Sequence, residues 1–265
     1  MKFLIVGDPH GDKKIFDIKI NDEIDAIIIT GDLGKSDLQR KYHFEYSIKK
    51  GIENWKDLIS KDELKKIYTE TINSSIEILK YFASKKPTFF VLGNLREKRT
   101  KSIKDAEKKY NISLPKFEQE IKKIKNIKNI SFKKINFRGV EIVGIPYFNS
   151  IDWIEEFSPE NKKLTEYAKK EEPEAINFLK KLPKVDILVS HIPPHGILDR
   201  IDSPFVPKDW IGKHAGSKLI LNYVEKKQPR FVICGHIHES KGEEKLGQTR
   251  IINAGSSGDY QIIEI

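Results

Sequence analysis

The chain has 265 residues, of which 38% are hydrophobic and 33% charged, and its formal net charge is +9. This composition supplies enough apolar residues for a core and excludes an intrinsically disordered chain. No apolar run is long enough to span a bilayer, and the opening run is too short for a signal peptide. The single cysteine, Cys234, excludes disulfide bonds within the chain, and its apolar neighbours predict a core position. We therefore expect a cytoplasmic protein.

Five short apolar runs are predicted as strands, and each ends at polar residues of chemical interest. In chain order, the runs and the residues after them read KFLIV-GDPHGD, DAIIIT-GDLG, TFFVL-GNLR, VDILV-SHIPPHG and RFVIC-GHIHES. Parallel strands that deliver polar side chains from one end are typical of an α/β sheet with its site along that edge. Further strands are predicted at 131–137, 140–145, 250–253 and 260–264, with a hairpin at Arg138-Gly139.

Helices are predicted between these strands from the spacing of apolar residues. The predicted ranges are 55–84 with one break, 172–182, and 217–226 capped by Ser217. Isoleucines recur every third residue from Ile121 to Ile130, which predicts the narrow apolar edge of a charged helix. The sequence shows no linker or internal repeat, so we expect one domain over 1–265 with helical insertions at about 36–86, 96–130 and 152–182.

The positive charge is concentrated in one segment. Residues 96–134 contain 14 Lys and Arg against 5 Asp and Glu, so the rest of the chain is balanced. Solvated Lys-rich helices would account for this segment. A positive flank that attracts polyanions such as nucleic acid would account for it as well.

The strand ends together carry seven residues that could bind metal ions: Asp8, His10, Asp32, Asn94, His191, His236 and His238. Carboxylates, an amide oxygen and imidazoles form a mixed oxygen and nitrogen set that suits Mn²⁺, with Fe, Co, Ni or Zn as alternatives. Seven ligands are too many for one tetrahedral ion, but they suit two ions that share a carboxylate. Two ions about 3.5–4 Å apart can hold a bridging hydroxide that attacks phosphorus.

The pattern D-x-H, G-D, G-N, a lone His and G-H-x-H resembles that of the calcineurin-like metallophosphoesterases. SHIPPHGILDR, VICGHIHESKG and INAGSSGDY are most similar to the Icc-related predicted phosphoesterases. The resemblance implies a four-layer α-β-β-α sandwich of two mixed sheets. It also implies that one metal binds Asp8, His10, Asp32 and His238, and that the other binds Asp32, Asn94, His191 and His236.

One position departs from the family pattern. Many members have a histidine after the asparagine that contacts the phosphate and assists the leaving group, whereas this chain has Leu95. Leucine cannot donate a proton, so the leaving group needs little protonation or another residue supplies it. His195 and His214 are the candidates for this proton donor, and an exposed loop position would also explain each of them. Arg96 is a third catalytic candidate, which could supply positive charge to the phosphate; the adjacent basic cluster would also explain it.

We therefore predict a two-metal phosphohydrolase that acts on phosphodiesters. A metal-dependent nuclease is an alternative, favoured by the basic segment. A non-catalytic metal-binding scaffold is a second alternative, which Leu95 favours and the complete ligand set opposes. The substrate is a phosphoester, either a small molecule or a nucleic acid, and the oligomeric state stays open.

Overall fold

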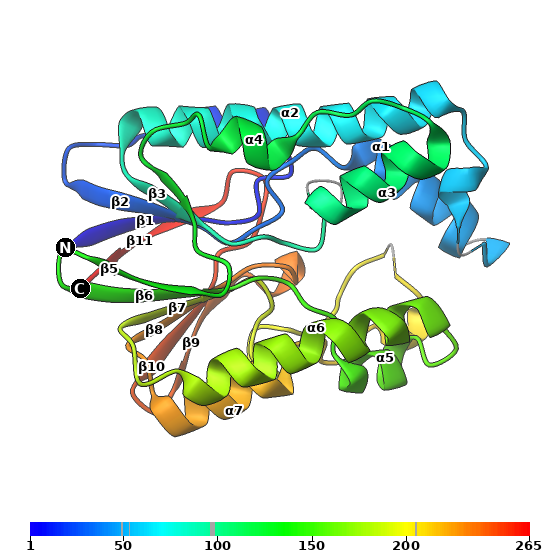
Figure 1. Cartoon of the computed structure of the whole chain (residues 1–265). Helices are drawn as coiled ribbons and strands as arrows, with labels where there is room; N and C mark the ends of the chain where they lie inside the picture. Colours follow the sequence, from blue (N-terminus) through cyan, green and yellow to red (C-terminus); the bar gives the residue numbers. More distant parts are fainter. Residues whose placement is uncertain (49, 53, 96–98, 205) are drawn as a thin grey trace.

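The computed structural model describes residues 1–48, 50–52, 54–95, 99–204 and 206–265 (Figure 1). Two mixed β-sheets face each other, and helices cover the outer face of each sheet (Figure 1). This arrangement is the predicted α-β-β-α sandwich. The first residue and the last lie side by side, because the Met1 amino group donates to the Ile265 carbonyl oxygen over 2.7 Å.

The first sheet has the strand order β11-β1-β2-β3-β4. Four of its strands are parallel, and β11 pairs with β1 in the antiparallel sense. The bounds are β1 Lys2–Val6, β2 Ile24–Ile29, β3 Thr88–Phe90, β4 Ile127–Asn129 and β11 Tyr260–Glu264.

The second sheet has the order β5-β6-β7-β8-β10-β9, with four parallel central strands and an antiparallel strand at each edge. The bounds are β5 Lys133–Phe137, β6 Val140–Ile145, β7 Ile187–Ser190, β8 Phe231–Cys234, β9 Gly242–Leu246 and β10 Thr249–Asn253.

The helices on the side of the first sheet are η1 Lys13–Asp17, α1 Asp37–Tyr42, η2 His43–Ile48, η3 Trp55–Asp57, α2 Lys61–Lys85, α3 Thr100–Tyr110 and α4 Phe117–Ile121. The remaining helices are α5 Ile151–Phe157, α6 Lys162–Lys181, η5 Lys208–Trp210, α7 Lys218–Lys227 and η6 His238–Ser240. No helix among the described residues has both the length and the apolar content needed to cross a bilayer.

Three apolar layers hold the sandwich together. Strand β1 shows why, because its side chains alternate between two of these layers. Phe3 and Ile5 pack between the sheets, while Leu4 and Val6 pack under the helices of the first sheet. The third layer lies between the second sheet and helices α6 and α7. Burial on both faces explains why the parallel strands read as continuous apolar runs.

Several predicted elements agree closely with the structure. Strands β6 and β11 have the predicted bounds, and β5 and β6 pair across the turn at Arg138-Gly139. Helix α7 is capped by Ser217, whose side chain accepts from the Ile220 amide. Within the predicted helix at 55–84, the break falls at Ser60, which caps α2.

Three predictions about secondary structure were wrong or incomplete. The charged helix expected through Ile130 ends as α4 at Ile121, and Ile127 lies in β4, because pairing with β3 outweighs the local helical pattern. Helix α6 begins at Lys162 rather than at residue 172, and Pro173 lies inside it. Strand β9 was not predicted, because its sequence GEEKL is too polar to resemble a buried strand.

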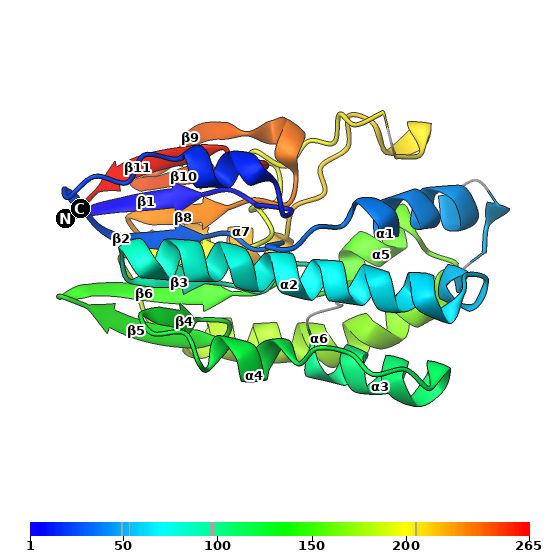
Figure 2. The same ribbon diagram turned by 90° about the horizontal axis from the view of Figure 1, so that it is seen from above.

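The carboxyl ends of the parallel strands meet at one edge of the sandwich. Helices α1, α3 and α5 lie beyond that edge (Figures 1 and 2). They belong to the three ranges predicted as insertions, whereas α2, in the first of these ranges, also covers the first sheet with Leu64, Ile72 and Phe82. Helices α1, α3 and α5 therefore lie next to the polar residues at the strand ends.

Candidate metal centre

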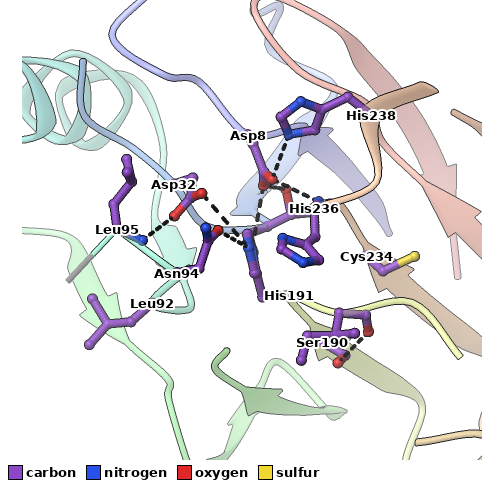
Figure 3. Close-up of polar contacts among 12 residues, drawn as sticks. Asp8, Asp32, Leu92, Asn94, Leu95, Ser190, His191, Cys234, His236 and His238 are labelled. Carbon is purple, nitrogen blue, oxygen red and sulfur yellow. Dashed lines mark hydrogen bonds and ion pairs between the residues drawn. The ribbon is translucent and has the colours of Figure 1, made fainter. Parts of the chain in front are cut away.

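Asp8 occupies the middle of the candidate metal centre, directly after β1 (Figure 3). Its carboxylate is fully buried, and Oδ1 accepts a 2.6 Å hydrogen bond from the Thr30 hydroxyl. Oδ2 accepts from the backbone amide of His236 over 2.8 Å and lies 3.2 Å from Nε2 of His238. Asp8 thus connects β1 and β2 of one sheet with the loop after β8 of the other.

A second group of oxygen and nitrogen atoms surrounds His191. Its Nδ1–H donates to the Thr30 carbonyl oxygen over 3.0 Å, which orients the ring so that Nε2 faces the other candidate ligands. That Nε2 lies 3.1 Å from Asn94 Oδ1 and 3.9 Å from Asp32 Oδ2 (Figure 3). The backbone amide of Leu95 donates a hydrogen bond to the other carboxylate oxygen of Asp32, Oδ1, over 3.0 Å.

His10 and His238 approach each other on the opposite side of Asp8. Their Nε2 atoms are only 3.3 Å apart. The guanidinium Nη2 of Arg40, on α1, lies 3.1 Å from His10 Nε2. Two imidazole nitrogens at this separation, next to a carboxylate, form a site for a proton or a metal ion.

These atoms form two groups in which the potential ligand atoms all lie within 4.8 Å of one another: Asp8, His10 and His238, and Asp8, Asp32 and His191. Asp8 belongs to both groups, whereas the family resemblance implies that Asp32 is shared. The rings of His236 and His191 are tilted by 52° to each other, with their centroids 4.9 Å apart, and Asn94 Oδ1 lies 3.1 Å from His191 Nε2. All seven predicted ligands therefore meet in one place.

The backbone at this centre adopts conformations that side chains usually avoid. His10, Asp32 and His236 have φ values of 48°, 24° and 68°. Such strain is held in place by surrounding structure and is concentrated at functional sites. Two glycines allow the close approach: a Cβ on Gly93 would lie 2.0 Å from Asp32 Oδ1, and one on Gly235 would lie 2.5 Å from Asp8 Oδ1.

The protonation states of the buried histidines and of Asp8 favour the binding of a cation. Burial lowers the pKa of His10 to about 4, with Arg40 acting in the same direction and Asp32 against it. Burial and the neighbouring His191 lower the pKa of His236 to about 3. Burial opposes ionisation of Asp8, but His191 and His238 outweigh it and hold the pKa of Asp8 well below its usual value. At neutral pH two histidines are thus neutral and Asp8 is charged, as metal binding requires.

The sequence model of the calcineurin-like phosphoesterase family matches residues 1–240. The chain belongs to this family. The uncharacterized protein MJ1162 of Methanocaldococcus jannaschii is 31% identical over 157 residues, which are 58% of this chain and 58% of that protein. Metallophosphoesterase domain-containing protein 1 of Homo sapiens is 42% identical over 71 residues, which are 26% of this chain and 20% of that protein.

The matched regions therefore cover less than two thirds of the length of both relatives. A crystal structure with 20% sequence identity has a TM-score of 0.54 over 99% of this chain and 94% of the other, and it shows the same fold. Membership of the calcineurin-like family and the metal-ligand donors together support metal-dependent phosphoester hydrolysis.

The two candidate catalytic histidines lie together, around a buried carboxylate. His214 Nδ1–H donates to Asp199 Oδ1 over 2.6 Å, and His195 Nδ1 lies 3.9 Å from Asp199 Oδ2. Asp199 also accepts from the backbone amides of Gly196 and Gly216. Both histidines line a small hollow with Trp153, whereas His236 lines a neighbouring one that shares Trp153 and Gly216. The third candidate, Arg96, lies outside the described residues.

Two further residues of the centre were missed in the sequence. Thr30 ends the DAIIIT run, and its hydroxyl and carbonyl fix Asp8 and His191. A threonine after a buried strand carries no signal of this role. Arg40 lies in a polar helix, and only the fold brings it to His10. Cys234, by contrast, is buried as predicted, and burial raises the pKa of its thiol well above the usual value, so it is unreactive.

Proposed function

We propose that this chain is a two-metal phosphohydrolase that acts on phosphodiesters. The observation that supports it best is that seven potential oxygen and nitrogen donors from five strand ends lie together. They lie at the edge where both sheets present their carboxyl ends. Oxygen and imidazole donors without thiolate suit a hydrolytic centre better than a structural zinc site.

In this proposal one ion binds Asp8, His10, Asp32 and His238, and the other binds Asp32, Asn94, His191 and His236. Bound divalent ions would polarise the phosphoryl oxygen and activate a water molecule. The chain's own groups orient the ligands: the Thr30 hydroxyl holds Asp8, and its carbonyl sets the tautomer of His191. We favour Mn²⁺, with Fe, Co, Ni and Zn as alternatives, and a cytoplasmic location.

Arg40 is our candidate for binding the phosphate. Leu95 cannot take the role of the family histidine, because its side chain is buried and points away from the cluster (Figure 3). The Arg40 guanidinium already lies 3.1 Å from His10 Nε2 on an otherwise exposed residue. If His10 Nε2 held a metal ion, its lone pair would no longer be open to Arg40, and the guanidinium would be available for a phosphate oxygen.

A nuclease is the second candidate function, because Lys101 and Lys104 are exposed on α3. Arg99 offers less support, since it pairs with Glu171 over 3.3 Å and donates to the Tyr147 carbonyl oxygen. If the lysines bind a polynucleotide, log affinity should fall against log salt by about 0.7 to 0.9 per phosphate contact, and Lys101→Gln with Lys104→Gln should reduce that slope. An unchanged slope, or no binding at low salt, leaves the small phosphodiester as the substrate.

The decisive experiment combines metal analysis with hydrolysis. The protein is stripped with a chelator, reloaded with Mn²⁺ or Zn²⁺, and assayed with bis(4-nitrophenyl) phosphate and 4-nitrophenyl phosphate. We expect two ions per chain, hydrolysis only in the loaded protein, and preference for the diester. Asp32→Ala should lose both metal and activity, whereas Asp62→Ala, on the exposed first turn of α2, is the matched control. Full activity in stripped protein or in Asp32→Ala contradicts the proposal, and an intact metal load without hydrolysis of any ester favours the scaffold.

A further inference from the structure

A cavity of about 430 Å³ adjoins the candidate metal centre. Asn94, whose Oδ1 lies 3.1 Å from His191 Nε2, lines it and so belongs to both the cavity and the centre. The other lining residues come from three parts of the sequence: residues 39–68, helix α3, and residues 161–167 at the start of α6. Helices α1 and α3, which supply several lining residues, lie beyond the strand ends (Figure 2). Its volume suits a small organic group and is within the usual range for ligand sites.

Aromatic side chains form much of the cavity lining. Trp55 and Tyr68 are 6% and 3% exposed, and Lys56 Nζ lies over both rings, so these two residues support the wall and leave little ring surface open. Tyr110 is held in place by a 2.7 Å hydrogen bond from its hydroxyl to Asp57, and Tyr167 lines the wall contributed by α6. Fixed aromatic surfaces favour a flat apolar group, since little conformational entropy is lost when such a group binds.

The polar lining constrains the ligand further. Gln39 lies on α1 next to Arg40 and lines the cavity. Its Oε1 is buried, and within the part of the chain that the structure describes it has no hydrogen-bond partner. A buried carbonyl oxygen accepts hydrogen bonds only, so a ligand that fills the cavity gains by bringing an N–H or O–H donor. Lys56, Lys109, Lys163 and Asp105 also line the cavity, and Lys109 pairs with Asp57 over 2.6 Å. The walls therefore carry charges of both signs and favour an uncharged ligand.

We propose that this cavity binds the organic group of the phosphoester, and that this group is an uncharged aromatic ring with a hydrogen-bond donor on its edge. The phosphorus end lies at Asn94 and the ring lies beside Tyr110 and Tyr167, which are only partly buried, with its donor toward Gln39. The proposal rests on the proposed function in one respect, the placement of the phosphorus at the metal centre. Two consecutive residues of α1 then contact different parts of the substrate: Arg40 contacts the phosphate, and Gln39 contacts the organic group.

The test measures binding rather than turnover, because phosphonates have no ester bond to cleave. Isothermal titration of Mn²⁺-loaded protein compares methylphosphonate, 4-methylphenylphosphonate and 4-aminophenylphosphonate. We expect the aryl compounds to bind at least about tenfold more tightly than methylphosphonate, and the amino compound about fivefold more tightly than its methyl counterpart. Gln39→Leu should remove the preference for the amino group, and Tyr167→Ala should weaken both aryl compounds.

Gln119→Leu on α4 is the matched control, since Gln119 is exposed and does not line the cavity. Equal dissociation constants for the methyl and aryl compounds in the unaltered protein overturn the proposal, and this comparison needs no variant to fold. An amino preference that survives Gln39→Leu overturns the assignment of Gln39. If the binding order is as expected but bis(4-nitrophenyl) phosphate is not hydrolysed, the proposed function fails and the cavity assignment stands.

Discussion

The carboxylate of Asp8 lies 3.2 Å from Nε2 of His238, although 230 residues separate them in the chain. Asp8 follows β1 of the first sheet, and His238 follows β8 of the second. A cation bound between them joins the two halves of the sandwich. Binding of metal ions should therefore stabilise the folded chain as well as enable hydrolysis.

This relationship predicts a metal-dependent melting temperature. At a free metal concentration 100 times the dissociation constant, a single site adds about 2.7 kcal/mol to the free energy of unfolding. For a chain of this size, that corresponds to a rise in Tm of roughly 5–10 °C. Calorimetry of stripped and Mn²⁺-loaded protein measures the shift. Asp8→Asn should abolish it, and the same rise in Asp8→Asn and the unaltered protein would show that the metal binds elsewhere.

The Thr30 hydroxyl offers a second prediction, because it is buried and donates to Asp8 Oδ1 over 2.6 Å. Thr30→Val keeps the shape of the side chain but removes the donor. We expect metal affinity to fall by about 10- to 100-fold, as for other residues that orient metal ligands. Thr30→Ser restores the hydroxyl and serves as the control. Equal metal affinities for the valine and serine variants, from competition with a chelator dye, would mean that the hydroxyl does not orient Asp8.

The lowered pKa of His10 predicts acid sensitivity of the metal-free protein. Its pKa is about 4 in the folded chain and 6.5 when unfolded, so the unfolded chain binds the proton first as the pH falls. The free energy of unfolding should decline between pH 6.5 and 4, by about 3 kcal/mol for His10. His236 acts in the same direction, while the raised pKa of His238 acts in the opposite one. Protonation of Asp8 lowers the free energy of unfolding only below about its unfolded pKa of 3.8, so Asp8 does not affect the decline between pH 6.5 and 4.

Urea denaturation of chelated protein at several pH values measures this decline. His10→Gln cannot take up the proton and should flatten the pH dependence between 6.5 and 4. A slope that is identical in His10→Gln and the unaltered protein assigns the acid sensitivity to other groups.

Local patterns could predict the strands that position the metal centre. Strand β6, Val140–Ile145, agrees with its predicted bounds because a Gly-containing turn precedes the buried apolar run and Pro146 follows it. The polar residues after β1, β2, β3, β7 and β8 could be predicted to meet because parallel strands share one edge. For each strand, the apolar run and the polar residues that follow it lie within a few residues of each other in the chain.

Long-range contacts could not be predicted in this way. Ile127 follows a helical spacing, yet its strand forms because the β3 edge offers unpaired backbone groups. Arg40 and Gln39 belong to a short polar helix, and only the packing of α1 over the strand ends brings them to His10 and the cavity. The grouping of the candidate metal-binding atoms also depends on tertiary geometry, which places Asp8 in both groups.

The His195 and His214 cluster allows a test of proton donation. Asp199 orients His214 through a 2.6 Å hydrogen bond, but it also ties the loop together through two glycine amides. We expect His195→Gln and His214→Gln to retain their metal. If either residue protonates the leaving group, its variant should lose activity toward alkyl esters more than toward 4-nitrophenyl esters, because 4-nitrophenolate leaves without a proton. Equal retention of activity on both ester types assigns the pair to loop structure alone.

The last prediction concerns Arg40, whose Nη2 lies 3.1 Å from His10 Nε2. A hydrogen bond from a guanidinium to a phosphate contributes about 1.5–3 kcal/mol. Arg40→Ala should therefore lower kcat/KM for bis(4-nitrophenyl) phosphate by about 10- to 100-fold while the bound metal is unchanged. Arg40→Lys should recover part of the loss, and added guanidinium should rescue Arg40→Ala but not Arg40→Lys.

Arg138→Ala is the matched control, because Arg138 pairs with Asp25 at the β5–β6 turn, on a different loop from the metal centre. If Arg40→Ala loses metal in proportion to activity, Arg40 supports His10 rather than the phosphate. If it keeps full activity, the contact with His10 has no role in catalysis, and the substrate is held by the metal ions and the cavity alone.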